Sequence, residues 1–229
     1  MSTWFDEQIT CPGCGLEQTA KLARGIHVSR APEARDQVFD RTFHRVTCRG
    51  CALRFVAARP LVYTDMERKH WVHVALAGET PRWPEMEKLA SDVFERAFTG
   101  SPLAAEMRDG FRLRLVFGIE ELREKLVIWR AGYSDAVVEC AKLQLIAKDT
   151  SLALAERLLV DEIDDAGAAL LVVDADDKLI RQTLIPMSLL EEQSDDDDRL
   201  RRYLPELFGG GFVSWRRMTS PRYRAPMTR

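Results

Sequence analysis

Four of the five cysteines form two Cys-x-x-Cys pairs, which is the spacing of metal ligands. The first pair is Cys11 and Cys14, and the second is Cys48 and Cys51. Two intervening residues make a tight turn in which both sulfurs can reach the same ion at about 2.3 Å. Four thiolates fill every position of a tetrahedral zinc site and leave none for water or a substrate. The pattern therefore predicts one structural zinc ion. A redox dithiol, the other interpretation of such a pair, leaves the second pair unexplained.

The residues around the first pair suit a tight turn better than those around the second. Pro12 restricts φ where the turn opens, and Gly15 permits a left-handed backbone where it closes. In the second pair Arg49 stands at the proline position and Ala52 at the glycine position. Both substitutions affect the turn and leave the cysteine spacing intact, so we expect metal binding at both pairs.

Other residues that could carry chemistry fit structural roles. His70 and His73 lie in a segment with period-2 alternation, which directs them to opposite faces of a strand, so a shared metal site would need a bend. Cys140 lies on the apolar face of a predicted helix and suits the core. The aspartate-rich stretches 161–165 and 174–177 lack the ligand order of a calcium loop, and turn formation accounts for them.

Length and composition indicate a folded protein. The chain has 229 residues, of which 46% are hydrophobic and 30% are charged, ordinary values for one or two globular domains. It contains no apolar run of the roughly 18 to 20 residues that span a bilayer, and its start lacks the features of a signal peptide. We therefore expect a cytoplasmic protein without membrane insertion, in a compartment where thiols stay reduced.

Extended segments are predicted on both sides of each cysteine pair. Residues 8–10 and 16–24 flank the first pair, and residues 42–47 and 53–57 flank the second. Antiparallel hairpins of this kind would bring the two turns together at their tips. The 33 residues between the pairs exceed the spacing of a compact four-cysteine site, and an insertion at 26–41 accounts for the excess. The pattern is that of a zinc-ribbon-like antiparallel β domain with an insertion.

Helices and further strands are predicted in the remaining sequence. Alternation or apolar runs predict further strands at 61–63, 71–77, 111–117, 152–163, 168–173, 178–185 and 212–215. Helical spacing predicts helices at 80–99, 119–131, 135–147 and 186–193. A polar segment at 32–39 begins with proline and suits a short helix or a loop, and the charge run at 194–198 suits a solvated loop. The fold class is therefore α+β, with helices and a small antiparallel sheet after the zinc-ribbon-like domain.

The predicted elements divide the chain into four sections. These are a zinc-ribbon-like β domain at 1–79, a helical section with one strand at 80–150, a small antiparallel β section at 151–217 that packs with it, and a tail at 218–229. The tail has two prolines, three arginines and little apolar content. We expect it to be disordered unless a partner holds it.

Three stretches of the sequence resemble the bacterial CpXC family, which takes its name from two Cys-Pro-x-Cys pairs. They are residues 9–15, 43–51 and 60–69, and residues 117–126 are also similar to the region that follows in relatives. Arg49 departs from the family proline but lies on the turn. The resemblance covers residues 7–130 and implies a zinc-binding domain of unknown function. It supplies no catalytic residues.

Charge is unevenly distributed along the chain. Residues 151–199 hold 4 basic and 14 acidic residues, whereas residues 200–229 hold 7 basic and 1 acidic. Such opposed segments favour charged contacts with another protein or with a second copy of the chain. With the closed metal site, they lead us to expect a non-enzymatic interaction or adaptor protein. Candidate partner contacts lie around the second cysteine pair, at Arg45, Arg49, Gly50 and Arg54.

Two alternative functions remain open from the sequence. A nucleic-acid-binding regulator would use a small basic rim formed by Arg41, Arg45, Arg49 and Arg54, with help from the arginine-rich tail. No folded portion is strongly basic, which disfavours a protein held on duplex DNA by phosphate contacts. The second alternative is an enzyme with an unrecognised site between the modules, for which the sequence offers no catalytic set.

Overall fold

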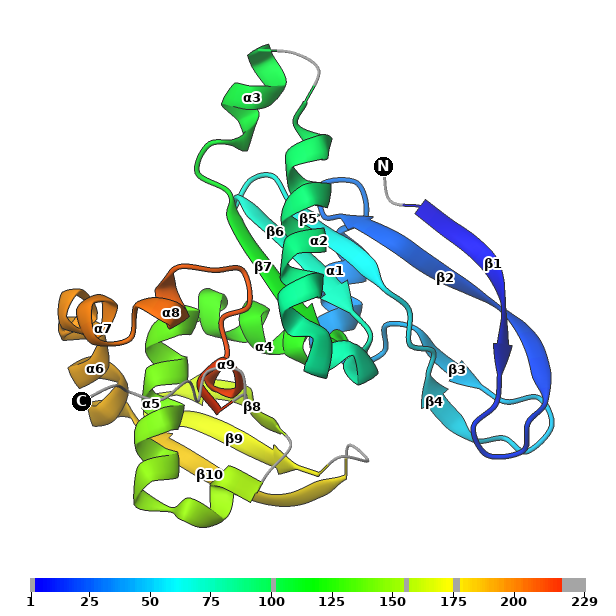
Figure 1. Ribbon diagram of the computed structural model, residues 1–229. Coiled ribbons are helices and arrows are strands. Elements are labelled where there is room, and N and C mark those ends of the chain that lie inside the picture. The colour runs from blue at the N-terminus through cyan, green and yellow to red at the C-terminus, as the bar shows by residue number, and fades with distance from the viewer. Residues whose placement is uncertain (1–2, 100–101, 155–156, 175–177, 220–229) are drawn as a thin grey trace. The chain divides into compact units, whose positions relative to one another are not determined.

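The computed structural model describes residues 3–99, 102–154, 157–174 and 178–219 (Figure 1). The chain divides into two compact units, Met1–Arg123 and Glu124–Arg229. Residues 218 and 219 belong to a short helix, and the rest of the tail expected to be disordered, 220–229, lies outside the described residues. Among the described residues, no helix has both the length and the apolar character needed to cross a membrane.

The first unit is built on a five-stranded mixed sheet, counted over the described residues, with the strand order β1-β2-β5-β6-β7. Its strands are β1 (Thr3–Thr10), β2 (Glu17–His27), β5 (Leu61–Asp65), β6 (His70–Ala75) and β7 (Arg112–Phe117). The β1–β2 and β5–β6 pairs are antiparallel. The β2–β5 and β6–β7 pairs are parallel, so each needs a long crossover connection.

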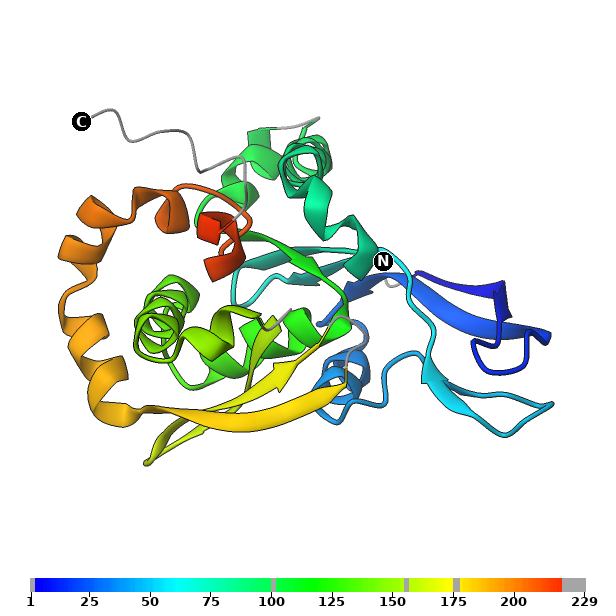
Figure 2. The same ribbon diagram turned by 60° about the horizontal axis from the view of Figure 1, so that its bottom comes forward.

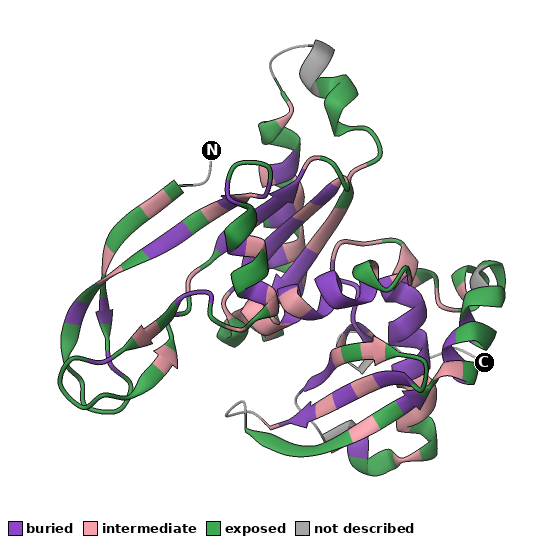
Figure 3. Ribbon diagram, turned by 180° about the vertical axis from the view of Figure 1, so that it is seen from behind, coloured by how far each residue is buried: buried purple, intermediate pink, exposed green. Residues whose placement is uncertain are grey.

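Both crossover connections carry helices, which cover opposite faces of this sheet (Figure 2). The first contains α1 (Pro32–Phe39), so the polar segment that begins with proline is a helix. The second contains α2 (Trp83–Ala97) and α3 (Pro102–Arg108). Helix α2 buries Trp83, Met86, Ala90 and Phe94, which follow one another at helical spacing. Figure 3 shows that buried positions concentrate on the central strands of the sheet.

The first crossover also contains the second cysteine hairpin. Strands β3 (Arg45–Thr47) and β4 (Arg54–Val56) pair antiparallel and form a small sheet of their own. The β1–β2 hairpin and the β3–β4 hairpin each have one cysteine pair in their turn. The mixed α+β fold predicted from the sequence is confirmed, with a ribbon-like arrangement of the two hairpins.

The second unit packs helices against a small antiparallel sheet with the order β10-β9-β8, as far as its described residues extend. The strands are β8 (Arg157–Asp164), β9 (Gly167–Val173) and β10 (Leu179–Pro186). The helices are α4 (Ile119–Arg130), which crosses the boundary of the units in the sequence, α5 (Asp135–Lys148), α6 (Met187–Asp195), α7 (Asp197–Tyr203), α8 (Pro205–Phe208) and α9 (Trp215–Thr219). One cluster of its core joins Leu152, Leu158, Val172 and Trp215.

Three sequence predictions in the second unit are wrong. Residues 152–154 belong to a 3₁₀ helix, Thr150–Leu154, and the strand begins only at Arg157. The charge run at 194–198 is the end of α6 and the start of α7, where acidic groups near a helix N-terminus are favourable. Residues 212–215 do not form a strand, and α9 begins at Trp215.

Side chains take the place of strand partners at 212–215. The Lys125 ammonium donates a hydrogen bond to the carbonyl of Val213 at 2.7 Å, and Glu139 accepts one from the backbone N–H of Trp215 at 2.7 Å. These bonds satisfy backbone groups that a sheet would otherwise pair. The segment is therefore attached to α4 and α5 without belonging to the sheet.

A network of buried charges lies between α4 and α5 in the second unit. The Lys142 ammonium contacts the carboxylates of Glu124 at 2.6 Å and Glu139 at 2.7 Å. Lys125 lies 3.5 Å from Asp135, and all five side chains are buried. Burial lowers the pKa of Lys142, but the two adjacent carboxylates outweigh this effect and hold it above its ordinary value. The ammonium group therefore stays charged in the core.

Candidate metal centre

The turn of the β1–β2 hairpin is fixed by backbone hydrogen bonds. The N–H of Cys11 donates to the carbonyl of Leu16 at 2.9 Å, and the N–H of Gly15 donates to the carbonyl of Cys11 at 2.9 Å. Gly15 has a φ of 73°, the left-handed conformation expected where the turn closes. The N–H of Gly13 points at the Cys11 sulfur, 3.4 Å away. Such a donor stabilises a thiolate.

The turn of the β3–β4 hairpin repeats this geometry with different residues. The N–H of Cys48 donates to the carbonyl of Leu53 at 2.8 Å, and the N–H of Ala52 donates to the carbonyl of Cys48 at 3.0 Å. The N–H of Gly50 lies 3.3 Å from the Cys48 sulfur. Ala52 takes the left-handed conformation with a φ of 61°, although it carries a Cβ. The departures at Arg49 and Ala52 therefore leave the turn intact.

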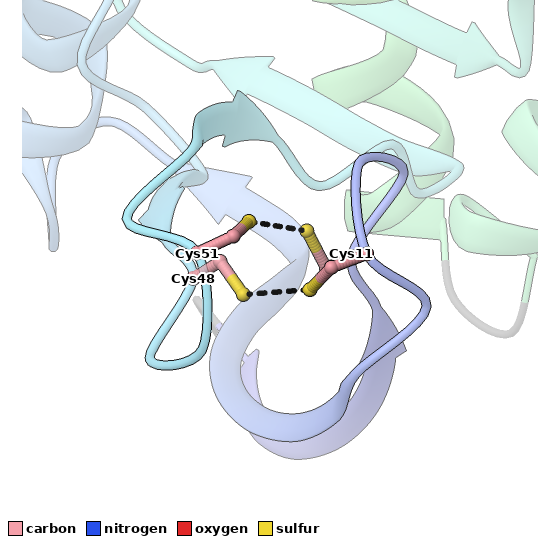
Figure 4. A group of neighbouring side chains, drawn as sticks. Cys11, Cys48 and Cys51 are labelled. Carbon is pink, nitrogen blue, oxygen red and sulfur yellow. Dashed lines mark hydrogen bonds between the residues drawn. The ribbon is translucent and has the colours of Figure 1, made fainter.

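The two turns bring four sulfur atoms into one cluster (Figure 4). The sulfurs of Cys11 and Cys51 lie 3.6 Å apart, as do those of Cys14 and Cys48. All four lie within 4.8 Å of one another. Ligands on a tetrahedral ion with bonds of 2.3 Å are about 3.8 Å apart. The four predicted ligands therefore fit the corners of one tetrahedral site, with a buried and an exposed cysteine from each turn.

The environment of the sulfurs separates their pKa values. Hydrogen bonds from the backbone N–H groups of Cys51 and Gly50 lower the pKa of Cys48 to about 6. For Cys14 the backbone hydrogen bond from Leu16 lowers the pKa, but the neighbouring thiols outweigh it and raise that pKa to about 12. Thiols this close cannot all ionise unless a cation lies among them. A bound metal ion supplies that cation and displaces the protons.

Gln18 connects the two hairpins beside the sulfur cluster. Its side-chain amide donates to the carbonyl of Thr47 at 3.2 Å and accepts from the backbone N–H of Arg49 at 2.9 Å. The side chain is buried. The role of Gln18 could not be predicted from the sequence, because nothing in a glutamine on a strand indicates hydrogen bonds to another hairpin. The hairpins are thus linked by hydrogen bonds as well as by the cysteines.

His44 comes four residues before Cys48 in the sequence and has a packing role. It is buried and stacks on Phe43 with ring centroids 4.0 Å apart, and its Nε2 accepts a hydrogen bond from the backbone N–H of Ala23 at 2.8 Å. Burial lowers the pKa of His44 to about 4, so the imidazole is neutral at pH 7. Across the described residues, the four cysteines are the one group of three or more candidate ligands placed to hold a metal ion. His70, His73 and Cys140 are buried elsewhere.

Comparison with known protein families supports the same four ligands. A family model described as CpXC protein matches residues 9–142, which is more than half of the chain. The chain belongs to the CpXC family. No curated protein and no solved structure shows a significant match to it. In this CpXC protein the matched range contains all four clustered cysteines, the β3–β4 hairpin and strands β2, β5, β6 and β7. Of β1 it contains only the last two residues, Ile9 and Thr10.

The other residues singled out from the sequence surround the second turn of the CpXC protein. Arg49 and Gly50 lie in that turn, Arg45 is on β3 and Arg54 is on β4, and all four are exposed. A Cβ on Gly50 would lie 3.0 Å from a methyl group of Leu16, so the two turns are packed against each other. These positions are available for contact with a partner.

The left-handed conformation of Ala52 gives a prediction for turn stability. Replacing it with glycine removes the steric cost of a Cβ at a φ of 61°. We expect Ala52→Gly to raise the free energy of unfolding of the CpXC protein by about 0.5–1 kcal/mol, and Gly15→Ala to lower it by a similar amount. Urea denaturation of the metal-loaded chains measures both. A loss of stability in Ala52→Gly would contradict the proposed strain.

Proposed function

We propose that the four cysteines bind one structural zinc ion in a non-enzymatic interaction or adaptor protein. The observation that carries the proposal is the cluster of four sulfurs, all within 4.8 Å, at the tips of two hairpins. An all-thiolate tetrahedral donor set suits zinc. Such an ion would cross-link segments that are distant in the sequence.

A closed centre of this kind supports binding in preference to chemistry at the metal. Four thiolates leave no coordination position for water or a substrate. Their negative charge exceeds that of the ion, so the ion would be a poor Lewis acid. The metal would instead fix the relative positions of β1–β2 and β3–β4, and with them the side chains that the two turns expose.

The surface around the turns suits contact with another protein or with a second copy of the chain. Arg45, Arg49, Gly50 and Arg54 are exposed there. Exposed Leu16 and Leu53 follow the two cysteine pairs, and exposed Val56 lies on β4. Arginine together with apolar side chains is a composition that protein interfaces favour. We place the protein in the cytoplasm, where the thiols would stay reduced.

The proposal is tested with the full chain as bait in a lysate of its source cells. We expect zinc-loaded protein to capture a defined partner, or itself at a defined stoichiometry by light scattering, and Arg49→Glu to reduce the capture severalfold. The matched control is Arg30→Glu, an exposed arginine between β2 and α1. A zinc-loaded monomer that captures nothing above background would contradict the proposal, as would equal losses in the two variants.

A further inference from the structure

A polar cleft lies between β2 and β3, beside the second cysteine turn. Its volume is about 490 Å³, which is within the range of ligand-binding pockets. Residues 18–22 of β2 line one side, and residues 44–47 with Arg49 line the other. The cleft lies entirely within the first unit. Its walls belong to the two hairpins that the cysteines bring together.

The cleft has a strongly one-sided charge. Lys21, Arg45 and Arg49 line it, and no carboxylate does so among the described residues. These three side chains are exposed and form no ion pair with any other described residue. By contrast, Arg24 and Arg59 both pair with Glu7, at 2.8 Å and 2.6 Å. Three unpaired cations around one cleft favour an anionic ligand.

The backbone of β2 is also open for pairing beside the cleft. Strand β2 pairs with β1 along its length, but with β5 only at Gly25, Ile26 and His27. Its second edge therefore has no strand partner from residue 17 to 22 in the described structure, and at Ala23 the N–H donates to His44. Strand β3 pairs with β4 and lines the cleft as well, but its Arg45 N–H already donates to the carbonyl of Thr42, and its Thr47 carbonyl already accepts from Gln18. Open strand edges present N–H and C=O groups to an added peptide.

Side-chain hydrogen bonds hold the cleft in shape at both ends. Gln18 bonds to the backbone of Thr47 and Arg49 at one end. At the other end, neutral His44 accepts the N–H of Ala23. Because the walls are connected independently of any ligand, little ordering would oppose binding.

We infer that this cleft binds an acidic, extended segment of a partner protein, an inference that rests on the proposed interaction function. Aspartate and glutamate side chains of the segment would pair with Lys21, Arg45 and Arg49, while its backbone would meet the open edge of β2. A peptide fits better than nucleic acid because the surroundings are nearly neutral: residues 1–79 contain 11 basic and 9 acidic residues. Binding to a phosphate backbone usually requires a far more basic surface.

The test uses the zinc-loaded full chain and a short fluorescein-labelled peptide that alternates aspartate with valine. We expect saturable binding by fluorescence anisotropy that weakens with salt. Loss of a charge-assisted contact should weaken binding about tenfold in each of Lys21→Ala, Arg45→Ala and Arg49→Ala. Arg30→Ala is the matched control, because Arg30 is an exposed arginine of the same unit that does not line the cleft. Zinc content and circular dichroism confirm that the variants fold.

Three results would overturn the inference. One is equal affinity for the same peptide with asparagine in place of aspartate, and another is an equal loss of affinity in Arg30→Ala. The third is tighter binding of a single-stranded oligonucleotide than of the acidic peptide at about 50 mM salt, where phosphate contacts are strong. Capture of the partner protein tests the proposed interaction function independently of the cleft. If the triple cleft variant still captured the wild-type partner, this inference would fail and that function would stand.

Discussion

Cys48→Ser is expected to abolish stoichiometric zinc binding and to unfold the two cysteine hairpins. Cys48 is buried and lies 3.6 Å from Cys14, and it accepts an N–H from Gly50. Structural zinc contributes about 10–16 kcal/mol in small peptides, which exceeds the stability of most domains. The hairpins β1–β2 and β3–β4 would keep only the hydrogen bonds and packing between them, including those of Gln18.

Metal analysis and hydrogen exchange measure this effect together. The zinc-to-protein ratio should fall from one to near zero, and amide protection in residues 8–24 and 42–57 should fall by at least about a hundredfold. Cys140→Ala is the matched control, since Cys140 is buried on α5 and lies outside the sulfur cluster. A Cys48→Ser chain that retained one zinc ion and full protection would show that the centre does not hold the hairpins together.

Lys142→Met is expected to destabilise the second unit by about 3–5 kcal/mol, the usual cost of removing one partner from a buried ion pair. The Lys142 ammonium lies 2.6 Å from Glu124 and 2.7 Å from Glu139, and all three side chains are buried. Removing the ammonium leaves two carboxylates in the core, opposed by the Lys125 ammonium that lies 3.7 Å from Glu139. Glu124 and Glu139 also accept the N–H groups of Val160 and Trp215, so the loss should spread to the sheet and to α9.

Urea denaturation gives the free energy of unfolding for this comparison. Lys148→Met changes an exposed lysine at the end of the same helix and should stay within about 0.5 kcal/mol of wild type. Adding Glu124→Gln to Lys142→Met should recover part of the loss, since it removes one of the unopposed charges. Equal stability of Lys142→Met and Lys148→Met would contradict the role given to the network.

The cysteine turns could be predicted from the sequence because their signals are local. Cysteine spacing, Pro12 and Gly15 indicate a turn without reference to the rest of the chain, and strands flanking both pairs were found near their predicted places. The resemblance to the CpXC family indicated the same four cysteines as ligands, and the family match over residues 9–142 confirms that resemblance. Features that depend on one short segment, such as the two turns, could therefore be predicted from the sequence.

Features that depend on contacts between segments distant in the sequence could not be predicted in the same way. Alternation in residues 71–77 and 111–117 predicted two strands, but nothing in either marks them as parallel neighbours across α2 and α3. Residues 212–215 have the composition of a strand, yet Lys125 and Glu139 satisfy their backbone. The cleft likewise needs Lys21 beside Arg45 and Arg49, which come from different hairpins.

The most direct test of the central claim is X-ray absorption spectroscopy at the zinc edge of the purified full chain. The account predicts one zinc ion per chain, surrounded by four sulfur atoms at about 2.3 Å and by no nitrogen or oxygen ligand. Removal of the ion by a chelator should then abolish that signal and loosen both hairpins. An oxygen or nitrogen ligand in the first coordination shell, or fewer than four sulfurs, would contradict a closed structural centre.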